Sequence, residues 1–246
     1  MTLAIDIGNT FTKIGIFNKG QLIDTAQYQN IGNNHIEAIL ADYPIKNAII
    51  CSVKNSEPEW PLVFGTKVRM VKFNPGLAIG ITNHYLSPKT LGPDRLASVT
   101  GAWFLYPGQN SLVISGGTCI TYDYVDAGGN YFGGSISPGL NMRYKALNYY
   151  TDGLPMLTAD DAFKHCYGND TTSAIRSGVQ NGIKYELNGF IESYQKEGQE
   201  LNIVLSGGDS IFFDTLLKNS IFARYIKIEP YLVLKGLNAA INNNND

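Results

Sequence analysis

Residues 3–13 read Leu-Ala-Ile-Asp-Ile-Gly-Asn-Thr-Phe-Thr-Lys, and the turn within them decides the fold because it occurs a second time. Asp6-Ile7-Gly8-Asn9-Thr10 and Ser115-Gly116-Gly117-Thr118 each follow a short apolar run and precede a further strand-like stretch. Two copies of one strand-turn motif indicate a duplicated fold. In the second copy, a serine stands where the first copy has an aspartate.

The composition excludes several classes of protein. The chain has 246 residues, of which 44% are apolar and 16% charged, so it is globular and can bury a substantial core. A net charge of −2 offers no basic surface for nucleic acid. No apolar stretch is long enough for a membrane span, and no signal peptide is recognisable, so we expect a cytoplasmic protein. The three scattered cysteines favour neither a disulfide framework nor a metal site.

The first half predicts strands mixed with helices, which is the α/β class. Turn signals divide residues 3–7, 12–17 and 21–27 into an antiparallel meander. A helical stretch near residues 34–40 leads to the apolar run 48–53, which is typical of a buried parallel strand. Pro93 fits the first position of a helix that ends near Tyr106-Pro107-Gly108, so Asp94 lies at a helix N-terminus.

The same pattern restarts after residue 108. Residues 111–114, 120–125 and 131–132 predict another meander, and we place two domains at 1–108 and 109–246 with a cleft between them. A strong amphipathic helix covers residues 175–194, where Gly178 and Gly182 indicate either an interface between subunits or internal packing. Residues 202–205 predict a strand that leads into Ser206-Gly207-Gly208-Asp209 and a helix, and residues 242–246 predict a frayed polar tail.

The first turn has the groups of a phosphate site. Backbone N–H groups of Gly8-Asn9-Thr10, the Thr10 hydroxyl and the Lys13 ammonium can surround phosphate oxygens, and Asp6 can hold a magnesium ion through water. One such turn is equally typical of an ordinary hairpin, but the partial repeat favours a phosphate site built from both halves. Glycines at 133–134, 139 and 207–208 permit close approach of a ligand, although glycines also serve ordinary turns. Asp94 has a purely structural explanation too, since an acid in the first turn of a helix opposes its dipole.

The motifs taken in order are more specific than any one of them. D-I-G-N-T with Lys13, G-P-D-R at 92–95, G-G-T-x-x-T-x-D at 116–123, G-G-x-I-x-P-G at 133–139 and S-G-G-D at 206–209 together resemble the type III pantothenate kinases. These kinases belong to the superfamily of acetate kinase, sugar kinases, Hsp70 and actin. The resemblance covers nearly the whole chain and implies two duplicated ribonuclease H-like (actin-like ATPase) domains with a nucleotide cleft between them.

The resemblance also implies an activity, the phosphorylation of pantothenate by ATP to 4'-phosphopantothenate, the first step of coenzyme A biosynthesis. Asp94 would be the catalytic base, and Asp6 would lie near Mg²⁺. The ATP-binding residues would be Asp6, Ile7, Gly8, Asn9, Thr10, Phe11, Thr12, Lys13 and Thr118. Pantothenate would be held by Tyr85, Gly92, Pro93, Asp94, Arg95 and Thr171. Thr171 resembles a threonine that reaches pantothenate from the partner subunit, which implies a homodimer with the active site at the subunit interface.

Ser115 departs from the family pattern. Members generally carry an aspartate there that is linked to a monovalent cation, K⁺ or NH₄⁺, which these kinases require. A serine hydroxyl is a neutral ligand and removes a negative charge, which weakens binding of a hard cation. Asp123 and Asp126 follow a few residues later and are candidates to compensate.

Three functions stay open at this point. The first is an active pantothenate kinase with altered cation dependence. The second is a catalytically impaired, nucleotide-binding regulatory protein on the same scaffold, and the third is a kinase for another small hydroxylated substrate.

Overall fold

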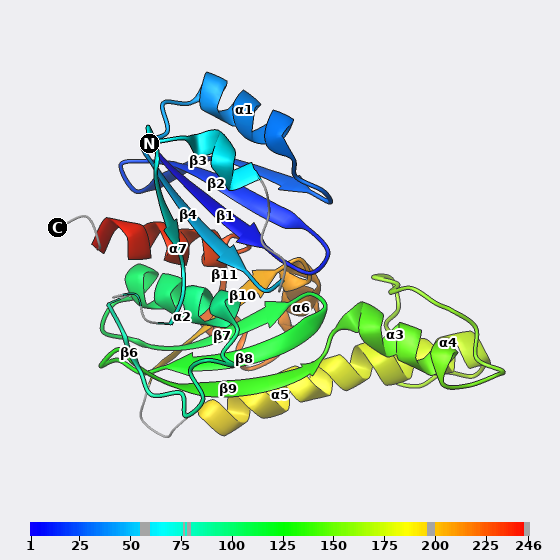
Figure 1. Ribbon diagram of the computed structural model, residues 1–246. Helices are drawn as coiled ribbons and strands as arrows, with labels where there is room; N and C mark the ends of the chain where they lie inside the picture. Colours follow the sequence, from blue (N-terminus) through cyan, green and yellow to red (C-terminus); the bar gives the residue numbers. More distant parts are fainter. Residues whose placement is uncertain (55–59, 76, 78–79, 196–199, 244–246) are drawn as a thin grey trace. The chain divides into compact units, whose positions relative to one another are not determined.

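The computed structural model describes residues 1–54, 60–75, 77, 80–195 and 200–243 (Figure 1). The chain forms two compact units, the first from Met1–Gly108, Ala127–Phe132 and Tyr231–Asp246 and the second from Gln109–Asp126 and Gly133–Pro230. The chain passes between the units at residue 108, where the sequence places its domain boundary. Residues 127–132 and the C-terminal helix, which the sequence places in the second domain, belong to the first unit.

The first unit contains a sheet in the order β3-β2-β1-β4-β5. The strands β1 (Thr2–Ile7), β2 (Thr12–Asn18) and β3 (Gln21–Tyr28) are an antiparallel meander, which confirms the prediction. Next to β1, the strands β4 (Asn47–Ser52) and β5 (Arg69–Lys72) run parallel to it, so the buried parallel strand is confirmed as well.

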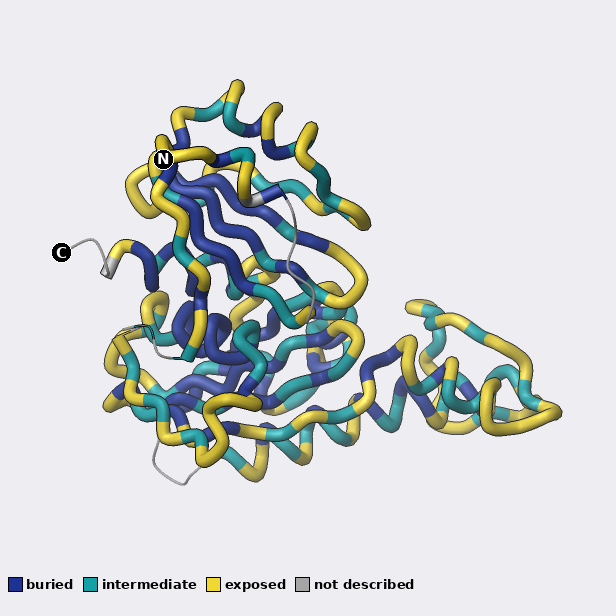
Figure 2. The backbone as a smooth tube through the Cα atoms, in the orientation of Figure 1, coloured by how far each residue is buried: buried dark blue, intermediate teal, exposed yellow. Residues whose placement is uncertain are grey.

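The two faces of this sheet have different partners. Alternation along β1 sends Leu3, Ile5 and Ile7 into one core with Ile36 and Ile39 of α1 (Asn33–Asp42). Ala4 and Asp6 therefore point to the opposite face. The helix α7 (Leu232–Asn243) contacts β1 and β4, and α2 (Pro93–Leu105) contacts β4. Neither helix belongs to the core that Leu3, Ile5 and Ile7 join, so both lie on the opposite face. The buried strands of this sheet are dark blue in Figure 2.

The helices α2 and α7 cross with their backbones in close contact. A Cβ at Gly236 would lie 1.9 Å from the carbonyl oxygen of Ala97, and one at Gly101 would lie 2.6 Å from that of Leu232. The helix α7 also corrects the sequence analysis, because Asn242 and Asn243 of the predicted frayed tail are its last residues. The rest of that tail, residues 244–246, lies outside the described residues.

The second unit repeats the strand order of the first. Its strands lie in the order β9-β8-β7-β10-β11, with β7 antiparallel to β8 and parallel to β10, as β1 is to β2 and β4. The bounds are β7 (Asn110–Gly116), β8 (Cys119–Val125), β9 (Asn130–Pro138), β10 (Leu201–Gly207) and β11 (Ile226–Ile228). The duplication inferred from the two turns is thus confirmed by topology.

Short elements and helices complete the two units. The first unit has η1 (Trp60–Phe64) and β6 (Thr82–Asn83), which pairs with the first residues of β9. The second has α3 (Leu140–Tyr149), α6 (Ser210–Leu217) and η3 (Ala223–Tyr225). No helix in the described ranges is long and apolar enough to cross a membrane. The cytoplasmic location stays a prediction.

One long helical stretch of the second unit has three parts, which are α4 (Thr171–Arg176), the π-helical η2 (Ser177–Asn181) and α5 (Gly182–Tyr194). Its apolar stripe is buried, as the periodicity predicts, with Ile175, Val179, Ile183, Leu187 and Ile191 in the core. A Cβ at Gly178 or Gly182 would meet no described atom within 4 Å. Of the two interpretations of these glycines, internal packing is therefore not seen within the described chain.

Candidate active site

A row of polar side chains crosses the first sheet near the end of β1. Asp6 is in register with Lys13 of β2 and with Cys51 of β4. Residues directly opposite on neighbouring strands point to the same face, so these three side chains lie on the face that α2 and α7 cover. Burial raises the pKa of the Cys51 thiol well above its ordinary value, so it is the neutral member of the row.

The ionised form of Asp6 is disfavoured by its surroundings. Burial and then the charge of Asp94 raise the pKa of Asp6 from 3.8 to about 7, while Lys13 lowers it. Its Oδ1 is buried and has no hydrogen-bond partner among the described residues. Such an atom is costly unless a ligand satisfies it, and a carboxylate oxygen suits Mg²⁺. The described residues contain no cluster of three or more potential metal ligands, so oxygens of a bound triphosphate would have to complete the coordination.

Asp94 faces this row from the first turn of α2, with Pro93 at the start of the helix as predicted. Its Oδ1 accepts a hydrogen bond from the backbone N of Arg95 at 2.9 Å. A side chain at Gly92 would lie 2.6 Å from the same oxygen, so glycine leaves the room that this carboxylate occupies. The positive end of the helix dipole favours a carboxylate at this position.

An aromatic wall adjoins Arg95, whose side chain is buried. The Arg95 guanidinium carbon lies 5.7 Å from the centroid of the Tyr85 ring. Tyr85 in turn stacks on Tyr131 of β9, with centroids 6.4 Å apart and planes 7° apart. The structure thus brings Tyr85 together with the G-P-D-R segment. Sequence reasoning missed Tyr131, because nothing but its place in an apolar strand marks it.

The turn between β1 and β2 is open to solvent. Gly8 N donates to Phe11 O at 3.0 Å, and Asn9, Thr10 and Phe11 are exposed. The side chains of Ile7 and Thr12 are buried. Of the predicted ATP-binding residues, these two can therefore offer only main-chain groups to a nucleotide.

The second unit carries the matching row at the end of β7. Ser115 is in register with Thr121 of β8 and with Ser206 of β10, the positions that Lys13 and Cys51 hold beside Asp6. Three hydroxyl side chains thus replace a carboxylate, an ammonium and a thiol. The Oγ of Ser115 is buried and has no hydrogen-bond partner within the described part of the chain.

Three glycine motifs of the second unit meet at the turn after Ser115. Gly139 N donates to Thr118 O at 3.1 Å, and Asp209 N donates to Gly116 O at 3.3 Å. A Cβ at Gly139 would lie 2.2 Å from Gly117 O, and one at Gly207 would lie 2.2 Å from Gly116 O. These segments are far apart in the sequence, so their convergence around the exposed Gly117 and Thr118 favours ligand contact over three unrelated turns.

Neither candidate aspartate takes the place of a carboxylate at Ser115. Asp123 is in register with Val113, so it lies on the same face as Ser115 but two positions, roughly 7 Å, along the strand. It is fully buried. Asp126 follows the far end of β8, roughly 17 Å from Thr121 at about 3.4 Å per residue.

Thr171 is exposed at the first position of α4. Asp170 caps this helix, because its Oδ1 accepts from Ser173 N at 2.9 Å. The hydrogen bonds from Ser173 hold the pKa of Asp170 below its ordinary value. The backbone that carries Thr171 is therefore held by a capped helical turn.

The chain is similar to known proteins over most of its length. The model of the type III pantothenate kinase family matches residues 2–193. The chain belongs to the type III pantothenate kinase family. A type III pantothenate kinase of Phocaeicola vulgatus is 42% identical over 99% of both chains, and one of Bacteroides fragilis is 40% identical over 100% of this chain and 99% of its own length.

Solved structures show the same fold at low identity. A Campylobacter jejuni protein assigned to the Baf family of transcriptional activators has a TM-score of 0.62 at 17% identity, covering 99% of this chain and 98% of its own. A Sinorhizobium meliloti protein assigned as a 2-dehydro-3-deoxygalactonokinase has a TM-score of 0.55 at 12% identity, covering 99% of each chain. The two-domain fold of sugar kinases and actin-like ATPases, implied by the resemblance, is confirmed.

Proposed function

We propose that this type III pantothenate kinase transfers the γ-phosphoryl group of ATP to the primary hydroxyl of pantothenate and so begins coenzyme A synthesis. The observation that carries the proposal is the meeting of Asp94, at the start of α2, with the row of Asp6 and Lys13 at the end of β1. The G-P-D-R segment and the proposed phosphate-binding turn are distant in the sequence, and we infer that they form one active site.

Phosphoryl transfer needs positioning and charge stabilisation more than covalent chemistry. Asp94 accepts the proton of the attacking hydroxyl, while the Lys13 ammonium and the N–H groups of Asn9 and Thr10 hold phosphate oxygens. The N–H of Gly8 closes the turn by donating to Phe11 O. Asp6 would hold Mg²⁺, which neutralises the charge of the phosphates when bound. The unpartnered, buried Oδ1 of Asp6 supports this assignment.

Pantothenate presents a carboxylate as well as hydroxyl groups. The planar guanidinium of Arg95, held against the ring of Tyr85, matches a carboxylate in charge and geometry. Gly92 and Pro93 complete the floor of this site, since Gly92 leaves space in front of Asp94. In the second unit, Thr118 is the exposed hydroxyl that contacts ATP.

We propose that K⁺ or NH₄⁺ binds at Ser115 more weakly than at an aspartate. The buried Ser115 Oγ can serve as one neutral ligand. The neighbouring Thr121 and Ser206 add no charge, and Asp123 lies two positions away. The binding free energy of a hard cation falls when its anionic ligand is lost.

We further propose a homodimer in which Thr171 reaches the pantothenate site of the partner. The helical stretch that begins at Thr171 carries the exposed Gly178 and Tyr185 and the half-buried Gly182 along one face, because residues four and seven apart share a side of a helix. The second unit also exposes several large aromatic side chains, which are typical of an interface: Tyr149, Tyr150 and Tyr167.

The first test is pantothenate-dependent ADP release with magnesium ATP in K⁺, in NH₄⁺ and in a large organic cation. The unmodified chain runs beside Ser115→Asp, with Ser111→Asn as a matched change on the same strand. We expect turnover by the unmodified chain and a lower K⁺ requirement for half-maximal rate in Ser115→Asp. No pantothenate-dependent release in either protein contradicts the proposal.

The neutral row of Ser115, Thr121 and Ser206 also favours one alternative, a catalytically impaired regulatory protein that binds nucleotide. In that case the unmodified chain binds ATP without turnover in every cation, and Ser115→Asp alone restores it. Faster phosphorylation of another small hydroxylated acid or sugar than of pantothenate would instead indicate a different substrate.

A further inference from the structure

A segment of twenty-one residues, 150–170, connects α3 to α4 without a helix or strand. Long segments of this kind are uncommon in compact domains unless they have a function. Its apolar residues Leu154, Leu157 and Ala159 pack on the core of the second unit. The segment ends at Asp170, directly before Thr171, so its course fixes where Thr171 lies.

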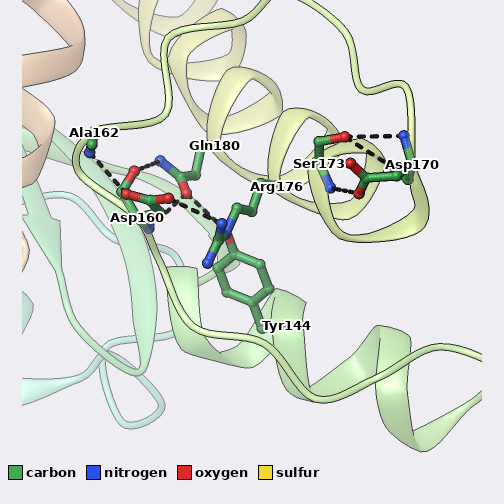
Figure 3. A network of polar contacts seen from close by, with 7 residues as sticks. All are labelled: Tyr144, Asp160, Ala162, Asp170, Ser173, Arg176 and Gln180. Carbon is green, nitrogen blue, oxygen red and sulfur yellow. Dashed lines mark hydrogen bonds and ion pairs between the residues drawn. The ribbon is translucent and has the colours of Figure 1, made fainter.

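Gln180 ties this segment to the helix. Its Oε1 accepts from Asp160 N and from the hydroxyl of Tyr144 on α3, each at 3.0 Å, and its Nε2 donates to Asp160 O at 3.0 Å (Figure 3). One amide thus binds both backbone groups of Asp160, as a neighbouring strand would. Gln180 is 3% exposed, so its removal would take a hydrogen-bond partner from the Tyr144 hydroxyl and from Asp160 N, while Asp160 O keeps the bond from Phe163 N at 3.0 Å.

The neighbours of Gln180 on the helix hold the same segment. Arg176 Nη1 lies 3.0 Å from Asp160 Oδ2. Asn181 Nδ2 donates to His165 O at 2.9 Å, and Ser177 Oγ donates to Cys166 O at 2.9 Å. Three of these four residues lie in the π-helical η2, a form that is rare and often marks functional sites.

The end of the segment closes tightly on α4. A Cβ at Gly168 would lie 2.0 Å from Ala174 N, so the chain passes against the helix with no room for a side chain. Ser173 Oγ accepts from the backbone N of Asn169 and of Asp170, at 3.1 and 3.2 Å. From Asp160 to Thr171 the segment is therefore attached at both ends.

We propose that Gln180 is a positioning residue for pantothenate binding, acting through the segment that places Thr171. The inference rests on the proposed function, in which Thr171 contacts pantothenate. The hydrogen bonds of Gln180 go to Asp160 and Tyr144, neither of which is among the residues assigned to ATP. Its loss should therefore affect one substrate.

The test compares Gln180→Met, which keeps the length of the side chain but loses its hydrogen bonds, with the unmodified full-length protein. We expect the KM for pantothenate to rise about 10- to 100-fold, as small displacements of binding groups do, with the KM for magnesium ATP unchanged. Asn181→Ala, which removes a more exposed anchor, should shift the same constant less. Asn188→Ala on the same helix is the control, since its amide donates only to Lys184 O among the contacts given for it.

A double variant separates positioning from general destabilisation. If Gln180 acts through Thr171, Gln180→Met adds little to the KM of Thr171→Ala, because effects through one contact are not additive. Three results would overturn the positioning role: additive effects of the two substitutions, an unchanged KM for pantothenate, or equal rises in the KM of both substrates. In each case, turnover by the unmodified protein would still support the proposed function. Absence of pantothenate-dependent turnover in the unmodified protein overturns both.

Discussion

Equivalent positions in the two repeats have diverged in charge. Asp6 and Ser115 are each the next-to-last residue of the central strand of their sheet, between two in-register neighbours. The row around Asp6 contains ionisable groups, and burying the charge of Asp6 costs free energy. The row around Ser115 contains only neutral hydroxyl groups. A buried acid with a raised pKa destabilises the fold when ionised, which is tolerated where the charge serves a ligand.

The first prediction concerns Asp6 and pH. The pKa of Asp6 is 3.8 unfolded and about 7 folded, so the folded state binds more protons and loses stability as pH rises between these values. Asp6→Asn should remove this loss. Each pKa unit corresponds to about 1.4 kcal/mol, so we expect the variant to gain a few kcal/mol at pH 8 and almost nothing at pH 4.

The measurement is urea unfolding of both proteins without magnesium across that pH range. A gain that is the same at pH 4 and pH 8 would show that the charge of Asp6 is not its source. Added magnesium ATP should narrow the difference at pH 8, because Mg²⁺ held by ionised Asp6 and the triphosphate would stabilise the unmodified protein more than Asp6→Asn.

The second prediction concerns Asp94 as the proton acceptor. Asp94→Asn keeps the hydrogen bond from Arg95 N but cannot accept the proton of the hydroxyl, so kcat should fall about 10²- to 10⁴-fold. Calorimetric binding of pantothenate should persist. Asp42→Asn, at an exposed aspartate of α1, is the matched control and should keep full activity. A kcat for Asp94→Asn within a few-fold of the unmodified enzyme would rule out this base.

At the scale of elements, the contact between α2 and α7 holds Asp94 in place. Two glycines let these helices approach until backbone meets backbone. The helix α2 begins at Pro93, so a shift of α2 along or away from α7 moves Asp94 relative to β1. The geometry of the proposed catalytic base therefore depends on a helix from the other end of the chain.

The third prediction is that Gly236→Ala impairs both stability and catalysis. The added Cβ would lie 1.9 Å from Ala97 O, which forces the helices apart, and such overpacking costs about 1–3 kcal/mol. The KM for pantothenate should rise as Asp94 and Arg95 move. Gly189→Ala, whose Cβ would meet no described atom within 4 Å, should be neutral or slightly stabilising in thermal unfolding. Equal behaviour of the two variants would contradict the packing argument.

Turn residues and hydrophobic periodicity predicted those structural features that depend on residues close together in the sequence. Both meanders, the start of α2 and the buried stripe of residues 175–191 follow from turn residues and periodicity. The membership of α7 in the first unit did not, because it depends on packing between residues more than a hundred positions apart. The π-helical turn also escaped prediction, since Val179 within it and Ile183 of the following α5 keep ordinary helical spacing, while Gln180 forms hydrogen bonds outside the helix. For the site, the sequence motifs single out Asp6, Lys13 and Asp94. The pairing of Asp6 with Lys13 needed the register of β1 and β2, and the approach of Asp94 needed the packing of α2.

At the scale of the whole molecule, the proposed dimer makes each active site depend on two chains. Asp94 comes from one subunit and Thr171 from the other, and this arrangement can be tested without a structure of the dimer. Heterodimers can carry the same two substitutions in two arrangements. In the trans form, one subunit has Asp94→Asn and its partner has Thr171→Ala; in the cis form, one subunit has both and its partner has neither.

The two forms lead to opposite outcomes. With a shared site, the trans heterodimer combines an intact Asp94 with an intact Thr171 at one of its two sites, so it should reach about half the activity of the unmodified dimer. The cis heterodimer then has no intact site and should turn over slowly at pantothenate concentrations below KM. If Thr171 serves its own subunit, the cis form is the active one. Purifying both forms through two different affinity tags and measuring ADP release decides between these arrangements, and an active cis form would remove Thr171 from the partner's site.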